Sequence, residues 1–418
     1  MSTLWQKSSQ SKINPLINQY TVGDDWQLDH QLFPYDIEGS IAHATMLQGI
    51  GILNESEHKA MVEALKEIKR LHKKGEIQIR PQDEDSHTVI EQHLIEKLGK
   101  VGAKIHTGRS RNDQVLVAIR LFAKHELTHI MYQMTELIRA LKAFAQKHKW
   151  MPLPGYTHTQ QAMLSSVGHT FMAYVESLQD DQKLIQIIQQ HVDQNPLGSA
   201  AGFGVSFPLN REATTQALHF HKTQNNSLYC QNSRGKFEGL ILEGLVQVMM
   251  SLGRIATDLL FWTSQECQFF SSSDQIVTGS SIMPQKRNLD VCEIIRANGS
   301  VVMANQQQIQ GITKNLISGY HRDLQLIKKP LIESLTITSD SIAVGKIVVE
   351  NIVPNQKRIE RKISTDIFAA DVANHLVQNK HIPFREAYQK AMDQLNEGTI
   401  DLKQNLKSKI SPGAPGTI

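Results

Sequence analysis

The stretch Leu240–Trp262, LILEGLVQVMMSLGRIATDLLFW, decides the fold class of this 418-residue chain. Its apolar residues recur in alternating steps of four and three, at Ile241, Leu245, Val248, Leu252, Ile255, Leu259 and Trp262. This spacing puts one apolar stripe along a helix, which is typical of helices that pack in bundles. Glu243, Arg254 and Asp258 interrupt the stretch, so it predicts a buried helix and not a membrane span.

Two further stretches share a seven-residue step between apolar residues. The first contains Leu127, Met134 and Leu141, and the second contains Leu164, Phe171, Leu178, Ile185 and Val192. No proline lies between Pro81 and Pro152 or between Pro208 and Pro284, so long helices are permitted there. We therefore predict an all-α fold with a central bundle of long helices. Such a bundle exposes apolar seams that oligomerisation can cover.

Charge and cysteine usage narrow the functional class. The formal net charge is only +3, and no basic block of the kind that follows a nucleic-acid backbone occurs, so nucleic acid is excluded as the expected partner. The three cysteines are scattered without metal-type pairing and indicate a reducing compartment. The first residues lack the apolar core of a signal peptide. These features predict a soluble cytoplasmic protein that acts away from membranes.

The segment Gly279-Ser280-Ser281-Ile282-Met283-Pro284-Gln285-Lys286-Arg287-Asn288 carries the first chemical signal. Gly279 and Pro284 indicate an irregular loop. Such a loop can direct backbone N–H groups, Lys286 and Asn288 at one anionic group. The alternative is a surface loop with a solvated lysine-arginine pair.

A second signal is His106-Thr107-Gly108-Arg109-Ser110-Arg111-Asn112-Asp113-Gln114. Arg109 and Arg111 flank a serine just before a predicted helix. The guanidinium forks and the free N–H groups of the helix start suit the binding of carboxylates. The alternative is an ordinary capped helix start with solvated arginines.

A third segment, Gly155-Tyr156-Thr157-His158-Thr159-Gln160, is predicted to open the next helix, with His158 ahead of its apolar stripe. A histidine at a helix start is more often a cap or a surface residue than a catalyst. Further upstream, the acidic residues 83–85 and His87 could be read as metal ligands. However, Thr88 and Glu91 fit a capping box, and no other His or Cys has ligand spacing, so we predict no metal.

The order of residues in these segments resembles a known family. The segment 279–288 is similar to the signature of the fumarase/aspartase superfamily, and 106–114 resembles that of argininosuccinate lyase within it. The segment 155–160 is similar to another block of that family. Shorter matches are residues 36–40, 85–91, 320–328 and 383–387, so the resemblance runs from about residue 25 to about residue 390.

The resemblance implies a fold and an activity. It implies three mostly helical domains, at 1–109, 110–356 and 357–418, and a homotetramer whose active sites are each shared between chains. The implied reaction is the reversible cleavage of argininosuccinate to arginine and fumarate in arginine biosynthesis, without metal or cofactor.

The residues can be assigned roles in that reaction. A proton must leave a carbon next to a carboxylate, and the charge that builds on this aci-carboxylate needs fixed donors, which Lys286 and Asn288 can supply. By resemblance the base is Ser280. His158, held by a carboxylate such as Glu293 of another chain, can relay or deliver a proton, and the identity of the acid stays open. The predicted substrate-binding residues are His87, Arg111, Asn112, Thr157, Tyr320, Gln325 and Lys328.

Three departures from the family pattern bear on how the amino-acid end of the substrate is bound and on the affinity for the substrate. Trp5-Gln6-Lys7 replaces the usual Trp-Gly-Gly start, Asp25 stands where the family usually has a substrate-contacting serine, and Leu326-Ile327 replaces an acidic pair. The C-terminal domain is also short. Alternatives are another lyase of the superfamily acting on a related succinylated amine, a non-catalytic protein such as the lens crystallins that resemble this lyase, and a helical scaffold.

Overall fold

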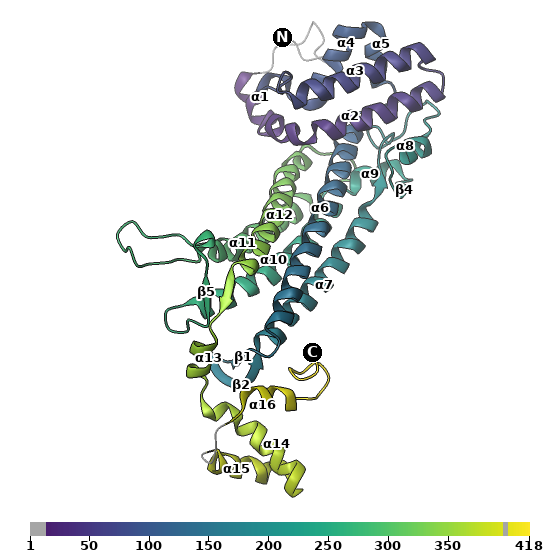
Figure 1. The fold of residues 1–418 in the computed structure, drawn as a ribbon. Helices are drawn as coiled ribbons and strands as arrows, with labels where there is room; N and C mark the ends of the chain where they lie inside the picture. The colour runs from purple at the N-terminus through teal and green to yellow at the C-terminus, as the bar shows by residue number, and fades with distance from the viewer. Residues whose placement is uncertain (1–13, 396–399) are drawn as a thin grey trace. The chain divides into compact units, whose positions relative to one another are not determined.

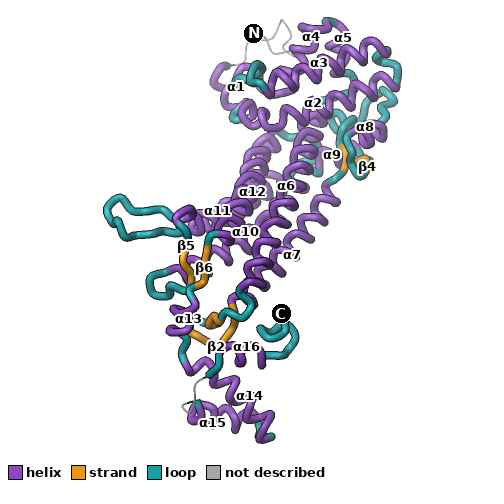
Figure 2. Tube along the Cα trace, viewed as in Figure 1, coloured by secondary structure: helices purple, strands orange, loops and turns teal. Residues whose placement is uncertain are grey.

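The computed structural model describes residues 14–395 and 400–418 (Figure 1). The departure at Trp5-Gln6-Lys7 lies outside the described residues. Helices dominate the described chain, as predicted, and strands form only two-stranded sheets (Figure 2). The α-helices are α1 (Pro15–Val22), α2 (Asp25–Gly49), α3 (Glu55–Lys73), α4 (Ser86–Leu98), α5 (Lys100–Ala103), α6 (Arg111–Lys147), α7 (Val167–Val192), α8 (Arg211–Ala217), α9 (Ser227–Asn232), α10 (Lys236–Thr263), α11 (Asp290–Thr313), α12 (Lys328–Glu350), α13 (Gln356–Lys362), α14 (Ala369–Lys380), α15 (Phe384–Gln394) and α16 (Leu402–Ser408).

The strands pair in three small sheets within the described residues. An antiparallel hairpin joins β1 (Pro152–Thr157) to β2 (Gln160–Ser166). The parallel pair is β3 (Gln194–Asn195) with β4 (Lys222–Thr223), and a second antiparallel pair is β5 (Phe270–Ser272) with β6 (Ile352–Pro354).

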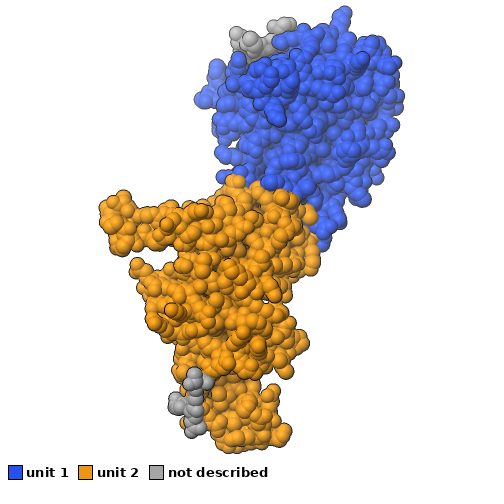
Figure 3. All heavy atoms as spheres, in the orientation of Figure 1, with its two compact units in different colours: residues 1–129, 184–245, 302–336 blue, residues 130–183, 246–301, 337–418 orange. Residues whose placement is uncertain are grey.

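The chain divides into two compact units, coloured separately in Figure 3. Unit 1 holds residues 1–129, 184–245 and 302–336, and unit 2 holds residues 130–183, 246–301 and 337–418. Each of the long helices α6, α7, α10, α11 and α12 contributes a segment to both units. The division into three domains at residues 109 and 356 stays a prediction.

In unit 1, α2, α3 and α4 enclose a core built around Phe33, Leu47, Leu65 and Leu94. The α3 helix begins with a capping box in which Asn54 and Glu57 satisfy each other's backbone N–H groups. A buried Arg120 on α6 lies 3.9 Å from the centre of the Phe237 ring and donates to Ser233 Oγ (3.0 Å) and to the carbonyl of Val192 (3.3 Å). Arg120 therefore links α6 to the end of α7 and the start of α10.

In unit 2, the predicted apolar stripe of α10 packs against three other helices. Its Leu252, Ile255 and Leu259 line one small apolar void together with Leu137 of α6, Ile295 of α11 and Val348 of α12. By length and composition, the helical stretch Ser227–Thr263 could cross a membrane, and 56% of its most apolar window is buried inside the structure. The long apolar stretch is thus a core helix of the bundle, as its interrupting charges predict.

Two helix starts differ from the sequence prediction. The segment 155–160 does not open a helix, because it forms most of the β1–β2 hairpin and α7 begins only at Val167. The apolar step that includes Leu164 therefore crosses from a strand into a helix. Likewise, Asp85 caps α4 by accepting the Thr88 N–H at 2.9 Å, so the predicted capping box of Thr88 and Glu91 is wrong.

Replacement of Phe171 should reveal how much of the stability depends on the aromatic core of unit 2. Phe171 is fully buried, with ring centroids 4.5 Å from Phe144 and 6.1 Å from Phe270. We expect Phe171→Ala to lower the free energy of unfolding by about 3–5 kcal/mol, because it leaves a cavity that the packed rings cannot fill. Urea denaturation followed by circular dichroism measures this loss. The matched control is Phe203→Ala at an exposed ring, and an equal loss in both variants would contradict the prediction.

Candidate active site

A polar pocket of about 150 Å³ lies in unit 1. It gathers side chains from α2, the segment before α4, the start of α6, the segment before α10 and the segment that leads into α12. The lining residues are Val22, Asp25, Glu84, Asp85, Arg111, Asn112, Val115, Arg234, Tyr320, Arg322, Gln325 and Lys328. The structure therefore brings together five of the predicted substrate-binding residues, namely Arg111, Asn112, Tyr320, Gln325 and Lys328.

Lys328 occupies the floor of this pocket. Only 2% of its side chain is exposed, and Nζ lies 2.7 Å from Asp29 Oδ1 and 3.1 Å from Asp25 Oδ1. The two aspartates share one face of α2 because they stand four residues apart. Burial lowers the pKa of Lys328, but the two carboxylates outweigh it and the net pKa is raised. Lys328 therefore stays protonated although it is buried.

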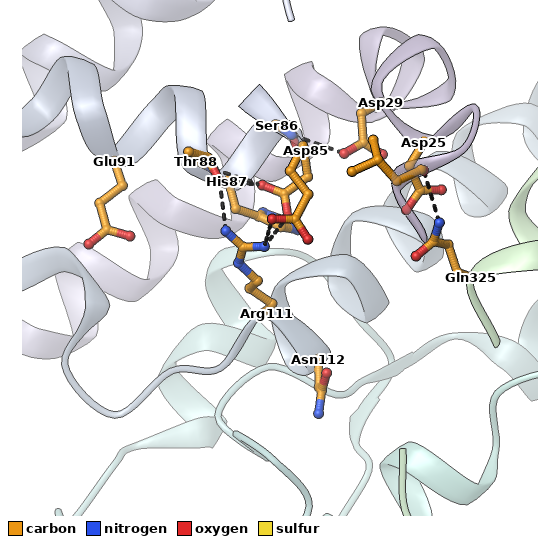
Figure 4. Close-up of polar contacts among 12 residues, drawn as sticks. Asp25, Asp29, Asp85, Ser86, His87, Thr88, Glu91, Arg111, Asn112 and Gln325 are labelled. Atoms are coloured by element: carbon orange, nitrogen blue, oxygen red, sulfur yellow. Dashed lines mark hydrogen bonds and ion pairs between the residues drawn. The ribbon is translucent and has the colours of Figure 1, made fainter. Parts of the chain in front are cut away.

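The two aspartates respond differently to the same lysine. Burial raises the pKa of Asp29, but Lys328 and His87 outweigh this effect and the net pKa is lowered. For Asp25, burial is the larger effect and raises the pKa to about 6. Figure 4 shows Gln325 next to Asp25, where its amide donates to the carbonyls of Thr21 and Val22 at 3.0 Å each.

Arg111 is paired with side chains of the pocket and of α4 (Figure 4). It lies 2.9 Å from Asp85 Oδ2 and 3.3 Å from Glu84 Oε2, and it donates to Thr88 Oγ1 at 2.7 Å. Arg109, the second arginine of the predicted carboxylate grip, is buried and donates to Ser40 Oγ at 3.0 Å, outside the pocket lining. Of the two arginines predicted to bind carboxylates, only Arg111 therefore lines the pocket.

His87 lies behind the pocket and is not among its lining residues. It is buried, with Nδ1 2.5 Å from Asp36 Oδ2 in a close ion pair, and Nε2 makes no hydrogen bond within the described residues. Burial lowers the pKa of His87, but Asp36 and neighbouring aspartates outweigh it and the net pKa is raised. Its predicted contact with substrate stays a prediction.

In unit 2, the loop that carries Ser280 is closed at its base by a backbone bridge between Thr278 and Asn288. Ser280 Oγ accepts hydrogen bonds from the backbone N–H groups of Met283 (3.2 Å) and Ile282 (3.4 Å). Two N–H groups directed at one hydroxyl favour its negatively charged form. This arrangement is the clearest chemical feature of the loop.

The cations of this loop differ in their surroundings. Arg287 pairs with Asp274 and donates to the carbonyl of Ser272 at 3.1 Å, so it is tied back to the unit. Lys286 is exposed and makes no side-chain hydrogen bond or ion pair within the described residues. Of the lysine-arginine pair, only Lys286 is therefore solvated. Its ammonium group can bind an anionic ligand.

His158 and Thr159 form the two-residue tip of the β1–β2 hairpin. Both have left-handed backbone conformations, with φ of 52° and 61°; histidine is among the residues enriched in this region, whereas a β-branched residue such as Thr159 is an outlier there. Such strain costs on the order of 1–3 kcal/mol per residue and is often found at functional sites. His158 and Thr157 are both exposed, as is Glu293 in the first turn of α11.

The sequence analysis missed Glu84, Arg234 and Arg322 as pocket residues. Arg322 pairs with Glu84 at 3.3 Å, and Arg234 is buried beneath the Tyr320 ring. No spacing signal marks them, because they come from separate segments that only the fold brings together. Within the described residues, no group of three or more His, Cys, Asp or Glu side chains could hold a metal ion.

Comparisons with known proteins identify the family of this chain. Residues 11–304 match the family described as Lyase. The argininosuccinate lyase of Thermotoga neapolitana is 42% identical over 92% of this chain and 96% of its own length. The argininosuccinate lyase of Sorangium cellulosum is 40% identical over 99% of this chain and 96% of its own length.

Two solved structures share the fold at low sequence identity. An EDDS lyase in complex with formate matches with a TM-score of 0.79 and 22% identity, over 97% of this chain and 88% of that one. A class II fumarase from Schistosoma mansoni matches with a TM-score of 0.78 and 16% identity, over 94% of this chain and 90% of that one. The match to full-length relatives is what decides the family: the chain belongs to the argininosuccinate lyases.

Proposed function

We propose that the protein catalyses the reversible cleavage of argininosuccinate to L-arginine and fumarate, as a step of arginine biosynthesis in the cytoplasm. The observation that carries this proposal is the Ser280 hydroxyl with two backbone N–H groups directed at it. The names of the full-length relatives support the substrate. The reaction proposed needs no metal or cofactor.

Ser280 acts as the base that removes the proton from the carbon next to a carboxylate of the succinyl part. A serine hydroxyl is a poor base at neutral pH, so its alkoxide has to be stabilised by nearby positive charge and N–H groups. The N–H groups of Ile282 and Met283 and the ammonium of Lys286 serve this purpose. Lys286 and Asn288 also donate to the aci-carboxylate, and loss of one such donor typically slows a reaction about a hundred- to a thousandfold.

His158 delivers or relays a proton to the departing guanidino nitrogen. Glu293 of another chain orients its ring and keeps it basic. The strained turn holds His158 in a left-handed conformation, so its imidazole is presented from a fixed backbone position. Thr157, just before this turn, contacts the substrate from the same chain as His158.

The pocket of unit 1 holds the two ends of the substrate. Arg111 and Asn112 bind a carboxylate of the succinyl part, for which Arg111 must exchange its contacts with Glu84 and Asp85. Tyr320, Gln325 and Lys328 bind the other end of the substrate, and His87 supports them through the charge of Asp29.

A homotetramer with active sites shared between chains completes the proposal. The long helices carry large apolar side chains that the single chain leaves exposed, and exposed patches of this kind often mark protein interfaces. These side chains are Tyr132, Ile187, Met250, Phe261, Ile294, Val301, Met303 and Ile347. A second copy of the same bundle is the natural partner for such faces.

Removal of the Ser280 hydroxyl tests the proposed function. Fumarate release from argininosuccinate is followed by ultraviolet absorbance in excess EDTA, and arginine is confirmed by mass spectrometry. We expect the wild type to release fumarate and Ser280→Ala to lose at least about a thousandfold in kcat, since the base is gone. Both proteins should elute as tetramers.

The matched control is Ser281→Ala, because the neighbouring hydroxyl accepts no backbone hydrogen bond within the described residues. We expect this variant to keep most of its activity. Near-normal turnover by Ser280→Ala would remove Ser280 from the role of base. Absence of fumarate release by a well-folded wild-type tetramer would contradict the proposed function, as would activity that appears only after metal is added.

Mixing two inactive variants tests the shared active site. Ser280→Ala lacks the base, and Lys328→Met lacks the buried cation of the pocket. If the two residues of one site come from different chains, random mixed tetramers contain intact sites, and we expect up to about a quarter of wild-type activity after joint refolding. Fumarate release by the mixture measures this recovery. Activity no greater than the sum of the separate variants, in a mixture that refolds to tetramers containing both chains, would show that both residues act within one chain.

A further inference from the structure

Asp25 carries an incompletely satisfied negative charge in the pocket. Its side chain is only 16% exposed, and Oδ1 shares Lys328 with Asp29. The second oxygen, Oδ2, makes no hydrogen bond or ion pair within the described residues. A carboxylate in such a setting can accept a cationic donor from a ligand.

Arg234 carries the matching positive charge. It is 4% exposed, and its Nε is buried without a hydrogen-bond partner. The guanidinium lies 5.0 Å from the centre of the Tyr320 ring, and its side chain makes no ion pair within the described residues. Burial lowers the pKa of Arg234; Tyr320 and Glu238 oppose this effect most, and Asp25 opposes it less. Asp25 and Arg234 both line the pocket.

The other charges of the pocket are already matched. Lys328 is held at 2.7 Å by Asp29, and Arg111 is held by Asp85 at 2.9 Å. Glu84 pairs with both Arg111 and Arg322 at 3.3 Å. Asp25 and Arg234 thus stand out as one open anion and one open cation in the same enclosed space.

We propose that Asp25 and Arg234 bind the amino-acid end of the substrate, with Asp25 accepting from the α-ammonium and Arg234 donating to the α-carboxylate. This assignment rests on the proposed function, because it takes argininosuccinate and arginine as ligands. It explains why neither charge has a full set of partners among the described residues, since a zwitterion supplies both missing partners at once. It also gives this chain a carboxylate contact at a position where a serine could offer only a neutral hydroxyl.

Specificity follows from the same pair. A buried charge left without its partner is costly, so a ligand that lacks one group of the zwitterion should bind more weakly. The deaminated analogue is 5-guanidinopentanoate, which leaves Asp25 unmatched. The decarboxylated analogue is agmatine, which leaves Arg234 unmatched.

Calorimetric binding of L-arginine and these two analogues at pH 8 tests the proposal. We expect Asp25→Asn to weaken arginine binding about ten- to a hundredfold and to leave 5-guanidinopentanoate nearly unchanged. We expect Arg234→Gln to weaken arginine binding by a similar factor and to leave agmatine nearly unchanged. A mere structural defect would weaken all three ligands alike, so equal losses for arginine and the matched analogue would overturn the assignment.

Three controls keep this test decisive. Asp24→Asn removes an exposed carboxylate that pairs with Lys329, and it should bind all three ligands as the wild type does. Arg234→Lys keeps the charge if Arg234→Gln folds poorly, and it should still prefer arginine to agmatine. A wild type that releases fumarate but binds arginine and both analogues equally would overturn this inference alone, whereas a wild type that releases no fumarate would overturn the proposed function.

The unmatched charge of Asp25 should also affect the stability of the protein measured without added ligand. Lys328, Asp29, Asp85 and Arg234 face Asp25, and burial raises its pKa from 3.8 to about 6. A raised carboxyl pKa means that the folded state binds the proton more tightly than the unfolded state does. The ionised carboxylate therefore destabilises the fold fully above about pH 6, and this effect disappears as the pH falls below about 3.8.

We therefore expect Asp25→Asn to melt a few degrees above the wild type at pH 8, with a gap that closes near pH 4. Thermal unfolding of the ligand-free proteins at pH 8, 6 and 4 measures this difference. Saturating arginine at pH 8 should raise the melting temperature of the wild type more than that of the variant. A variant that melts below the wild type at pH 8, or an equal gap at all three pH values, would overturn the assignment of Asp25 as an unmatched charge.

Discussion

The pocket of unit 1 depends on one buried carboxylate, Asp29. It accepts from Lys328 Nζ at 2.7 Å and from the backbone N–H of Ser86 at 3.0 Å. Asp29 itself belongs to α2, Ser86 begins α4 and Lys328 begins α12, so this single group fixes three helices at the wall of one cavity. Removing one partner of a buried ion pair typically costs about 3–5 kcal/mol, because the other charge stays buried. The position of every pocket residue near these helix ends therefore depends on this contact.

A pocket held together by charges imposes a constraint on its ligand. Arg111 has two carboxylates as partners, so in the proposed function a substrate carboxylate has to compete with Asp85 and Glu84 for it. Such competition lowers affinity, but it also keeps the guanidinium in one orientation and reduces the ordering that binding requires. Asp25 and Arg234 are different, because each retains capacity for a new contact. In the proposed function, the contacts with Asp85 and Glu84 keep Arg111 oriented, and Asp25 and Arg234 provide affinity for the amino-acid end of the substrate.

The sequence predicts the long helices well, because their signal is local and repeated. The steps of four and three in Leu240–Trp262 and the heptads after Leu127 fall within α10 and α6. The helix prediction fails at residues 155–160. Leu164 continues the seven-residue step although it lies in β2, so periodicity alone placed the helix start too early. It also chose Thr88 and Glu91 as a capping box when Asp85 was an equally good cap one turn earlier. The charge balance around Lys328 could not be predicted, since it joins residues about 300 positions apart.

The two-residue turn at His158 and Thr159 explains why the failure at the hairpin matters for function. At the start of a helix, His158 would take an ordinary backbone conformation and could serve as a simple cap. In the hairpin it has a φ of 52°, which histidine adopts more readily than most residues, next to a β-branched threonine at 61°, where glycine or asparagine would be less strained. Strain of this kind lasts only where the surrounding structure enforces it, and the β1–β2 ladder from Pro152↔Ser166 to Thr157↔Gln160 does so. The hairpin therefore fixes the backbone of an exposed histidine beside a strained threonine, which supports the proposed role of His158 in an active site shared between subunits.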